Sequence, residues 1–302
     1  MTFIKKVVKK LFRCLGFTIS RYERSDALDY FLSLYPHCKH KDGFVYNVYG
    51  NMLYQNVTDH VNYRGLKQEQ NLKDYGSHES DEAAVIINRI KPGMTVIDVG
   101  ANIGLYTFLL ARLVGNEGKV ISFEPGPLSF SLLKANLIVN GFKNVTLENK
   151  AVTAKTQIEY YYSNQTIESG STVTTLLKPD FGHPRERIEV ETVSLDDYMS
   201  GNNYKIDYIK IDVEGGEYSA LKGMTNLLKS NPGIFLTIEY APYLPLWADI
   251  DLQIFLDFVR TFGFKIYDLR KSSHEAVSDK YLLDTYAKNN VGNYATLLLQ
   301  RS

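Results

Sequence analysis

TVIDVGANIG, residues Thr95–Gly104, is the stretch of sequence that decides the fold of this chain. A β-branched apolar run leads through an acidic residue to two glycines, and the amphipathic segment 105–113 follows. This order predicts a buried strand, a tight turn and the start of a helix. Gly100 and Gly104 allow the backbone to turn sharply and a ligand to approach it closely. The free N–H groups at the start of the helix suit a polar or anionic ligand group.

A second apolar run, residues 119–123, ends at Glu124, which lies 20 residues after Gly104. In a doubly wound sheet, an acidic residue at the end of the second strand faces a ribose and can accept hydrogen bonds from both of its hydroxyls. The turn and this acidic residue together predict a site for a nucleoside cofactor.

The turn itself narrows the choice of cofactor. It reads Gly-Ala-Asn-Ile-Gly rather than Gly-x-Gly-x-x-Gly, so the dinucleotide fingerprint is incomplete. Asp98 stands two residues before the first glycine, where a carboxylate would repel a pyrophosphate and attract a cationic amino-acid tail. The pattern resembles motif I of class I S-adenosylmethionine (SAM) methyltransferases, in which Asp-x-Gly-x-x-x-Gly holds the methionine end of the cofactor.

The composition limits the class of protein. The chain has 302 residues, 44% of them hydrophobic, which is enough for one large domain or a domain with an appendage. The net charge is zero, so we expect no nucleic-acid partner. Cys14 and Cys38 are the two cysteines, and this argues against a disulfide scaffold or a zinc module. We expect a cytoplasmic protein, because no apolar run is long enough to span a bilayer.

Residues 1–75 are expected to form an N-terminal extension with helical and β elements. Residues 2–24 predict a basic amphipathic helix, 26–35 a second short helix, and 44–63 a hairpin around Gly50-Asn51. The first helix either docks peripherally on an anionic membrane surface or packs on the main domain with its basic face in solvent. The extension as a whole either shapes the entrance to the site or stabilises the domain.

Strands and helices alternate over the rest of the chain. Segments 157–162 and 188–193 alternate in polarity and predict an inserted β-hairpin or flap. The long alternation predicts an α/β fold with a doubly wound, mostly parallel sheet that binds ligands at the carboxyl ends of its strands. Helices are expected at 80–90, 105–113, 128–139, 217–229 and 252–262, and strands at 145–147, 208–211, 234–238, 264–269 and 294–300.

Three motifs resemble those of the FkbM-type methyltransferases: VIDVGANIG at 96–104, FEP at 123–125 and IKIDVEGGE at 209–217. The resemblance covers roughly residues 76–240. It implies a Rossmann-like class I methyltransferase domain, which we place at 76–302, with SAM as the cofactor. Members of this family mostly make O-methyl ethers on sugars and secondary metabolites, so the resemblance implies a small-molecule, sugar or glycolipid acceptor.

The resemblance also assigns roles to individual residues. Glu124 would hold the ribose, Asn149 and Ala151 would lie beside the adenine, and Asp212 would lie next to the transferred methyl group. Glu217 is expected to be an acidic residue at a helix N-terminus. The residues expected to line the methionine end are Asp98, Gly100, Ala101, Asn102 and Gly104.

A hydroxyl acceptor must lose its proton when it is methylated, and a carboxylate or imidazole can take it. Asp212 is the first candidate base, followed by Glu239, Glu79, His78 and His183. Two carboxylates, Asp212 and Glu239, make a weak metal site, and no metal is predicted.

The sequence thus predicts a SAM-dependent O-methyltransferase. One alternative is an NAD(P)-dependent Rossmann oxidoreductase, which Asp98 and the missing third glycine disfavour. Another is a non-catalytic SAM-binding interaction module, which the presence of Asp98, Glu124 and Asp212 disfavours.

The membrane interpretation of residues 2–24 predicts that the protein co-sediments with anionic vesicles and is released by salt, because basic side chains and the apolar stripe both contribute. Phe12→Ala and the quadruple change of Lys5, Lys6, Lys9 and Lys10 to Glu should each weaken sedimentation. If Phe12→Ala instead lowers the melting temperature and the wild type does not sediment, the helix packs on the domain.

Overall fold

The computed structural model describes residues 21–22, 43–48, 51–56, 80–163, 186–201, 205–244, 247, 249–271 and 275–301. His78, Glu79 and His183 lie outside the described residues, as do the predicted helix at 26–35 and most of the predicted helix at 2–24.

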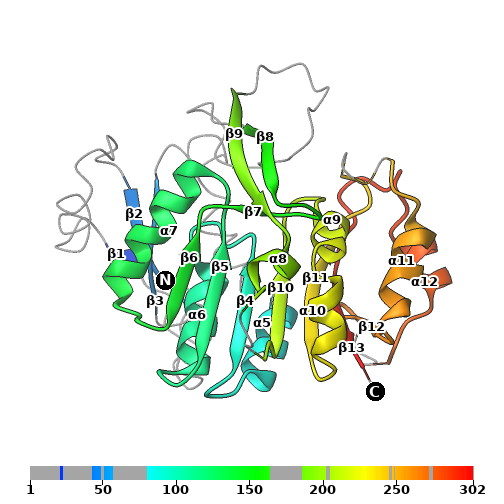
Figure 1. Cartoon of the computed structure of the whole chain (residues 1–302), viewed down its shortest axis with the longest axis horizontal. Coiled ribbons are helices and arrows are strands. Elements are labelled where there is room, and N and C mark those ends of the chain that lie inside the picture. The colour runs from blue at the N-terminus through cyan, green and yellow to red at the C-terminus, as the bar shows by residue number, and fades with distance from the viewer. Residues whose placement is uncertain are drawn as a thin grey trace, which may run out of the picture.

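A seven-stranded sheet forms the centre of the molecule, in the order β12-β13-β11-β10-β4-β5-β6 (Figure 1). Neighbouring strands from β11 to β6 are parallel, and β13 runs antiparallel to both β11 and β12. The predicted doubly wound, mostly parallel sheet is confirmed. Its strands are β4 Thr95–Val99, β5 Lys119–Phe123, β6 Val145–Glu148, β10 Tyr208–Ile211, β11 Phe235–Tyr240, β12 Lys265–Asp268 and β13 Ala295–Gln300.

Helices cover both faces of this sheet. Val96 of β4 packs with α5 and α6, whereas Ile97 and Val99 face a second core formed with α8 to α12. A central parallel strand is buried on both faces, which explains the nearly continuous apolar run in β4. The first layer contains α5 Ser80–Arg89, α6 Leu105–Val114 and α7 Pro127–Asn140, and the second contains α8 Leu195–Tyr198, α9 Glu217–Lys222, α10 Thr225–Ser230, α11 Leu252–Thr261 and α12 Asp279–Thr285.

Two smaller sheets accompany the central one. Strands β7 Ala151–Val152, β9 Glu186–Val193 and β8 Gln157–Ser163 form the first, and the antiparallel β8–β9 pair confirms the predicted inserted hairpin. This hairpin rises above the sheet edge at which β4, β5 and β10 end (Figure 1).

The second small sheet joins β1 Arg21–Tyr22, β2 Gly43–Val48 and β3 Asn51–Asn56. Strand β3 lies against α7 and α6, and the β2–β3 pair confirms the described part of the hairpin predicted at 44–63. Because Arg21 and Tyr22 pair with β2 as a strand, the helix predicted over 2–24 does not extend through them, and that part of the prediction was wrong.

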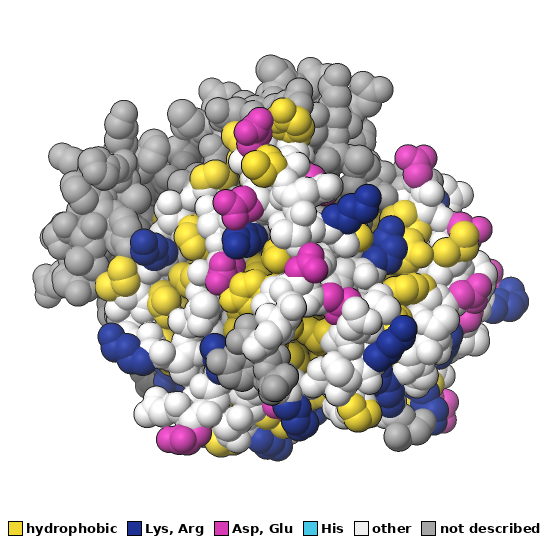
Figure 2. All heavy atoms as spheres, in the orientation of Figure 1, with side chains coloured by type: hydrophobic (Ala, Val, Ile, Leu, Met, Phe, Trp, Pro, Cys, Tyr) yellow, Lys and Arg dark blue, Asp and Glu magenta, His cyan; other side chains and the backbone are white. Residues whose placement is uncertain are grey.

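The described surface carries charges of both signs. Basic and acidic side chains are interspersed over the described part of the face in Figure 2, and neither sign forms a continuous area there. Among the described residues, no helix combines the length and the apolar character that crossing a membrane would need.

The helix predicted at 217–229 is in fact two helices, α9 and α10, separated at Gly223. A Cβ atom on Gly223 would lie 1.9 Å from the carbonyl oxygen of Thr153, which follows β7. The chain therefore breaks the helix where it packs against the β7 segment, a tertiary contact that helical periodicity does not reveal.

Gly223→Ala should lower the free energy of unfolding by about 1–3 kcal/mol, the usual cost of forcing an extra carbon into a packed site. Gly233→Ala is the matched control, because a Cβ atom there would meet nothing within 4 Å. Thermal unfolding of the two variants checks this. Equal melting temperatures would show that the Gly223–Thr153 contact does not constrain the fold.

Candidate active site

A row of polar residues crosses the middle of the sheet on the face covered by α5 and α6. Asp98 of β4 is in register with Ser122 of β5 and with Lys210 of β10, and Lys210 is in register with Thr237 of β11. All four residues are buried. Such residues in central strands need partners, because a buried polar group without one is costly.

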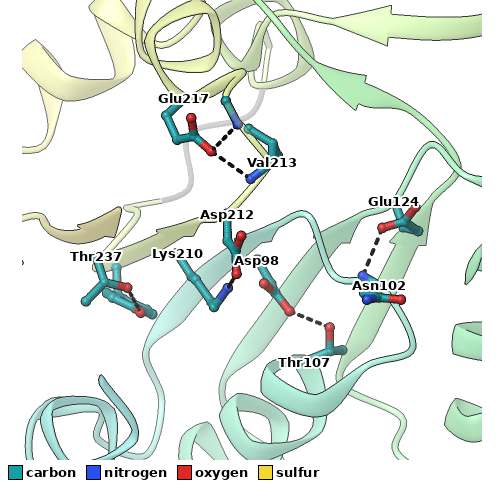
Figure 3. A network of polar contacts seen from close by, with 11 residues as sticks. Asp98, Asn102, Thr107, Glu124, Lys210, Asp212, Val213, Glu217 and Thr237 are labelled. Carbon is teal, nitrogen blue, oxygen red and sulfur yellow. Dashed lines mark hydrogen bonds and ion pairs between the residues drawn. The ribbon is translucent and has the colours of Figure 1, made fainter. Parts of the chain in front are cut away.

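The helix α6 supplies partners for Asp98 (Figure 3). The Thr107 hydroxyl donates to Asp98 Oδ2 at 2.6 Å and is hydrogen-bonded to Ser122 at 3.0 Å. Asp98 Oδ1 is buried without a hydrogen-bond partner in the described part of the chain. Burial raises the pKa of Asp98, while Lys210 and Thr107 oppose the rise. A direct contact between Asp98 and the methionine end of SAM stays a prediction.

The predicted glycine turn is confirmed, since Gly100 and Gly104 have φ values of 89° and 103°. A Cβ atom on Gly100 would lie 1.7 Å from the carbonyl oxygen of Asp212, and one on Gly104 would lie 2.3 Å from the Phe108 ring. Both glycines are therefore required by contacts within the protein, and the turn is held directly against the end of β10.

The Glu124 carboxylate is hydrogen-bonded to the backbone of this turn. Its Oε2 accepts from the backbone N–H of Asn102 at 2.9 Å, and its Oε1 accepts from that of Gly126 at 2.8 Å. Each carboxylate oxygen can accept a further hydrogen bond, which leaves capacity for two ribose hydroxyls. Burial raises the pKa of Glu124 to about 7, although the two backbone N–H groups oppose the rise.

The residues predicted beside the adenine have structural roles of their own. The Asn149 side-chain amide donates to the backbone carbonyls of Glu124 and Pro125, at 2.8 and 3.1 Å, and so fixes the loop after β5. Ala151 is buried in strand β7.

Asn102, in the glycine turn, was predicted to line the methionine end. It has a left-handed φ of 48°, which marks a locally strained turn. Contacts of Asn102 with methionine, and of Asn149 and Ala151 with adenine, stay predictions.

Asp212 stands at the rim where β10 ends. Its Oδ2 lies 2.9 Å from the Lys210 ammonium, and its side chain is 35% exposed, against 3% for Lys210. The rim residue that sequence analysis placed beside the transferred methyl group is thus accessible from outside, while its partner lies beneath it (Figure 3).

The loop that follows β10 is braced from within by Glu217. The fully buried Glu217 carboxylate accepts from the backbone N–H groups of Val213 and Gly215, at 3.0 and 3.1 Å. Glu217 is the first residue of α9, as predicted, and it also closes the loop that carries Asp212. Glu214 within this loop has φ 54°, a conformation that costs free energy and persists where its surroundings impose it.

Glu239, near the end of β11, adds a further carboxyl to this rim. Burial raises the pKa of Glu239 well above its ordinary value, and repulsion from Asp212, Glu214 and Glu217 adds to the rise. Burial likewise raises the pKa values of Glu214 and Glu217 to about 7. Among the described residues, no group of three or more His, Cys, Asp or Glu side chains is arranged to hold a metal ion.

Glu82 and Lys210 belong to this network, and sequence analysis missed both. Glu82 of α5 is buried, its carboxyl is hydrogen-bonded to Thr237, and burial raises its pKa. A signal was present in the sequence, because Glu82 precedes the buried residues Ile86 and Ile90 by four and eight positions, on the apolar stripe of its helix.

The arrangement suits a cationic nucleoside. Three buried carboxylate oxygens have no hydrogen-bond partner within the described ranges, namely Asp98 Oδ1, Glu217 Oε2 and Glu239 Oε2. They belong to the carboxyl-terminal parts of β4 and β11 and to the start of α9, around the rim on which Asp212 stands. SAM carries a sulfonium and an ammonium group, so its charge complements this set of acceptors.

Comparison with known proteins supports the same class. The methyltransferase FkbM domain family matches residues 98–266, more than half of the chain. A second family, protein-L-isoaspartate(D-aspartate) O-methyltransferase, matches residues 42–151.

The chain is similar to two curated methyltransferases and to one solved structure. Hexuronic acid methyltransferase AglP of Haloferax volcanii is 28% identical over 153 residues, which cover 50% of this chain and 59% of that protein. The 31-O-demethyl-FK506 methyltransferase FkbM of Streptomyces tacrolimicus is 29% identical over 163 residues, covering 45% and 61%. The chain therefore spans about three-fifths of the length of these curated relatives. A crystal structure of a SAM dependent methyltransferase from Aquifex aeolicus superposes with a TM-score of 0.43 at 15% identity, covering 77% of this chain and 95% of that one.

The fold and the site define a class I SAM-dependent methyltransferase domain. Within that class, the chain belongs to the FkbM methyltransferase family. This membership confirms the resemblance and SAM as the cofactor, and it removes the oxidoreductase alternative. At the carboxyl ends of the parallel strands, where the fold predicts ligand binding, the structure brings together Asp98, Gly100, Glu124, Asn149, Asp212 and Glu239.

The ribose role of Glu124 predicts a pH-dependent affinity for S-adenosylhomocysteine (SAH). The ionised carboxylate accepts more strongly from the two hydroxyls, so binding should tighten as pH rises through about 7. One such group gives about tenfold tighter binding at pH 8 than at pH 6. Glu124→Gln should weaken binding at pH 8 by about 1–3 kcal/mol and reduce this pH dependence.

Titration calorimetry at both pH values measures these affinities. Glu148→Gln is the matched control, because it changes a carboxylate at the end of the neighbouring strand β6. The control should keep the wild-type pH dependence. An SAH affinity of Glu124→Gln equal to that of the wild type at pH 8 would remove Glu124 from the ribose role.

Proposed function

We propose that this protein transfers the methyl group of SAM to a hydroxyl oxygen of a sugar, a glycolipid or a related small molecule. The observation that carries the proposal is the placement of Asp212: its backbone carbonyl lies against the turn at Gly100, and its carboxylate, one-third exposed, is held by Lys210. In this proposal Asp212 is the proton acceptor for an incoming hydroxyl, and its second oxygen is not engaged by Lys210.

The chemistry asked of the protein is modest. SAM supplies an electrophilic methyl carbon on a sulfonium, so the reaction breaks one carbon–sulfur bond and forms one carbon–oxygen bond. The chain must hold the acceptor oxygen in line with that bond, and such positioning can lower the barrier by several kcal/mol. The acceptor proton passes to a carboxylate within hydrogen-bond reach, and Asp212 is the proposed base.

Glu239 is the second carboxyl in this proposal. Burial raises the pKa of Glu239, which favours its protonated form, and a protonated carboxyl donates a hydrogen bond instead of accepting a proton. Two neighbouring carboxyl groups, one donating and the other accepting, can position a polyhydroxylated acceptor. We therefore assign Glu239 an acceptor-binding role and Asp212 the proton transfer.

Two relatives support an oxygen acceptor on a small molecule. The names of these proteins specify a hexuronic acid and a 31-O-demethyl compound as the molecules on which they act. The FkbM family model covers the loops that carry Asp98, Glu124, Asp212 and Glu239. These observations favour transfer to oxygen on a sugar-like molecule over a non-catalytic binding role.

Asp212→Asn should retain the fold and SAH binding and lower kcat by about 10²–10⁴-fold, because the amide cannot accept the hydroxyl proton. The assay follows transfer of tritiated methyl from SAM to p-nitrophenyl glucoside and p-nitrophenyl glucuronide. Asp207→Asn is the matched control, since Asp207 pairs with Lys205 at the other end of the same strand. It should keep the wild-type kcat.

Two results would contradict the proposal. Wild-type kcat in Asp212→Asn would remove Asp212 as the base. SAH binding by the wild type, without methyl release to any hydroxyl probe, would favour the non-catalytic SAM-binding alternative.

A further inference from the structure

Lys210 is an amino group buried beneath the floor of the site. It lies on β10, two residues before Asp212 on the same face of the sheet, and it is 2% exposed. Its Nζ is 2.9 Å from Asp212 Oδ2 and 4.7 Å from the centre of the Tyr106 ring on α6. Charged groups are rarely buried this fully unless they are paired.

Lys210 acts electrostatically on carboxyl groups of several elements. Lys210 lowers the pKa of Glu82 on α5 and of Asp98 on β4, in each case against the larger effect of burial. It is the largest charge effect on both groups. It also lowers the pKa of Glu214 and of Glu239, for which burial is again the largest cause. One cation thus connects α5, the cofactor strand and the rim.

The chain contains an internal comparison for this pair. Lys205 pairs with Asp207 in the same Lys-x-Asp spacing just ahead of β10, but its side chain is 77% exposed. An ion pair whose ammonium is this exposed contributes little, because solvent screens the charge and the lysine side chain loses entropy when it is held. The Lys210–Asp212 pair differs in its burial, and a buried ammonium with hydrogen-bonded partners has few alternative positions.

The direction of the pair is also informative. The Lys210 end is buried in the polar row, while the Asp212 end reaches the accessible rim. The ammonium engages Asp212 Oδ2 and thereby sets the direction of the other carboxylate oxygen. Figure 3 shows Lys210 reaching Asp212 from below, close to Asp98.

We propose that Lys210 is a positioning residue, whose buried ammonium orients the Asp212 carboxylate for proton transfer. This inference rests on the proposed function, in which Asp212 takes the proton of the hydroxyl acceptor. Lys210 itself touches neither the acceptor nor the methyl group. Among the charged groups that act on Glu82, Lys210 has the largest effect, so Glu82 is the carboxyl to change together with Lys210.

The test separates positioning from charge balance by comparing Lys210→Met with the double variant Lys210→Met/Glu82→Gln. Removing the ammonium alone leaves buried carboxylates uncompensated, so Lys210→Met should have a lower melting temperature. The double variant also removes a buried negative charge and should recover much of that loss. Lys205→Met is the matched control and should behave as the wild type.

Activity and cofactor affinity are then measured on the double variant. We expect kcat for methyl transfer to the p-nitrophenyl glycoside probes to fall about 10²-fold, the scale of a small misplacement of a catalytic group. SAH affinity by calorimetry should stay within a few-fold of wild type, because Glu124 and the glycine turn are intact. Wild-type kcat in the double variant would show that Lys210 only balances charge and would overturn the proposal.

A crystal structure of the double variant with SAH gives a readout that does not depend on turnover. The Asp212 carboxylate should leave its wild-type orientation, and an unchanged orientation would overturn the proposal. If the wild type binds SAH but methylates no probe, the proposed function fails, and this structure still decides the positioning role of Lys210. If the double variant does not fold, the structure of Lys210→Met with SAH is compared instead, and an Asp212 carboxylate in its wild-type orientation there would overturn the proposal.

Discussion

The close approach of Gly100 to the carbonyl oxygen of Asp212 is the constraint on which the site depends. A single added carbon at Gly100 would overlap that oxygen. The backbone N–H of Asp212 also donates a hydrogen bond to the carbonyl oxygen of Val99 at 3.0 Å. The end of β4 and the end of β10 are therefore locked together, one carrying the cofactor turn and the other carrying the accessible carboxylate. Separated in sequence by more than a hundred residues, the two motifs function as one surface.

The same region concentrates negative charge in a poorly solvated place. Burial raises the pKa values of Glu124, Glu214 and Glu217 to about 7. A carboxyl whose pKa is raised on folding contributes stability below its unfolded value, near 4.5, and loses that contribution as pH rises through about 7. The domain thus sacrifices stability at neutral pH to keep carboxylates around the rim, and a cationic cofactor would offset part of this cost.

The central fold could be predicted from the sequence because its signals are local. Two strands were predicted from β-branched runs that are followed by glycines, at 95–99 and 119–123. The structure confirms the bounds of both strands. The break at Gly223 could not be predicted, because it depends on a carbonyl from another segment. The antiparallel direction of β13 was not specified either, since strand direction depends on tertiary connection. Among site residues, motifs indicated Glu124 and Asp212, whereas Glu82 required knowledge of which helix covers the polar row.

The most direct test of this account is a crystal structure of the wild-type protein with SAH. The account predicts that both ribose hydroxyls donate to the Glu124 carboxylate at about 2.7 Å, the usual length of such hydrogen bonds. It also predicts that the sulfur atom faces the rim at Asp212, beside the turn at Gly100. SAH bound away from the ends of β4, β5 and β10, or bound with Glu124 turned away from the ribose, would contradict it.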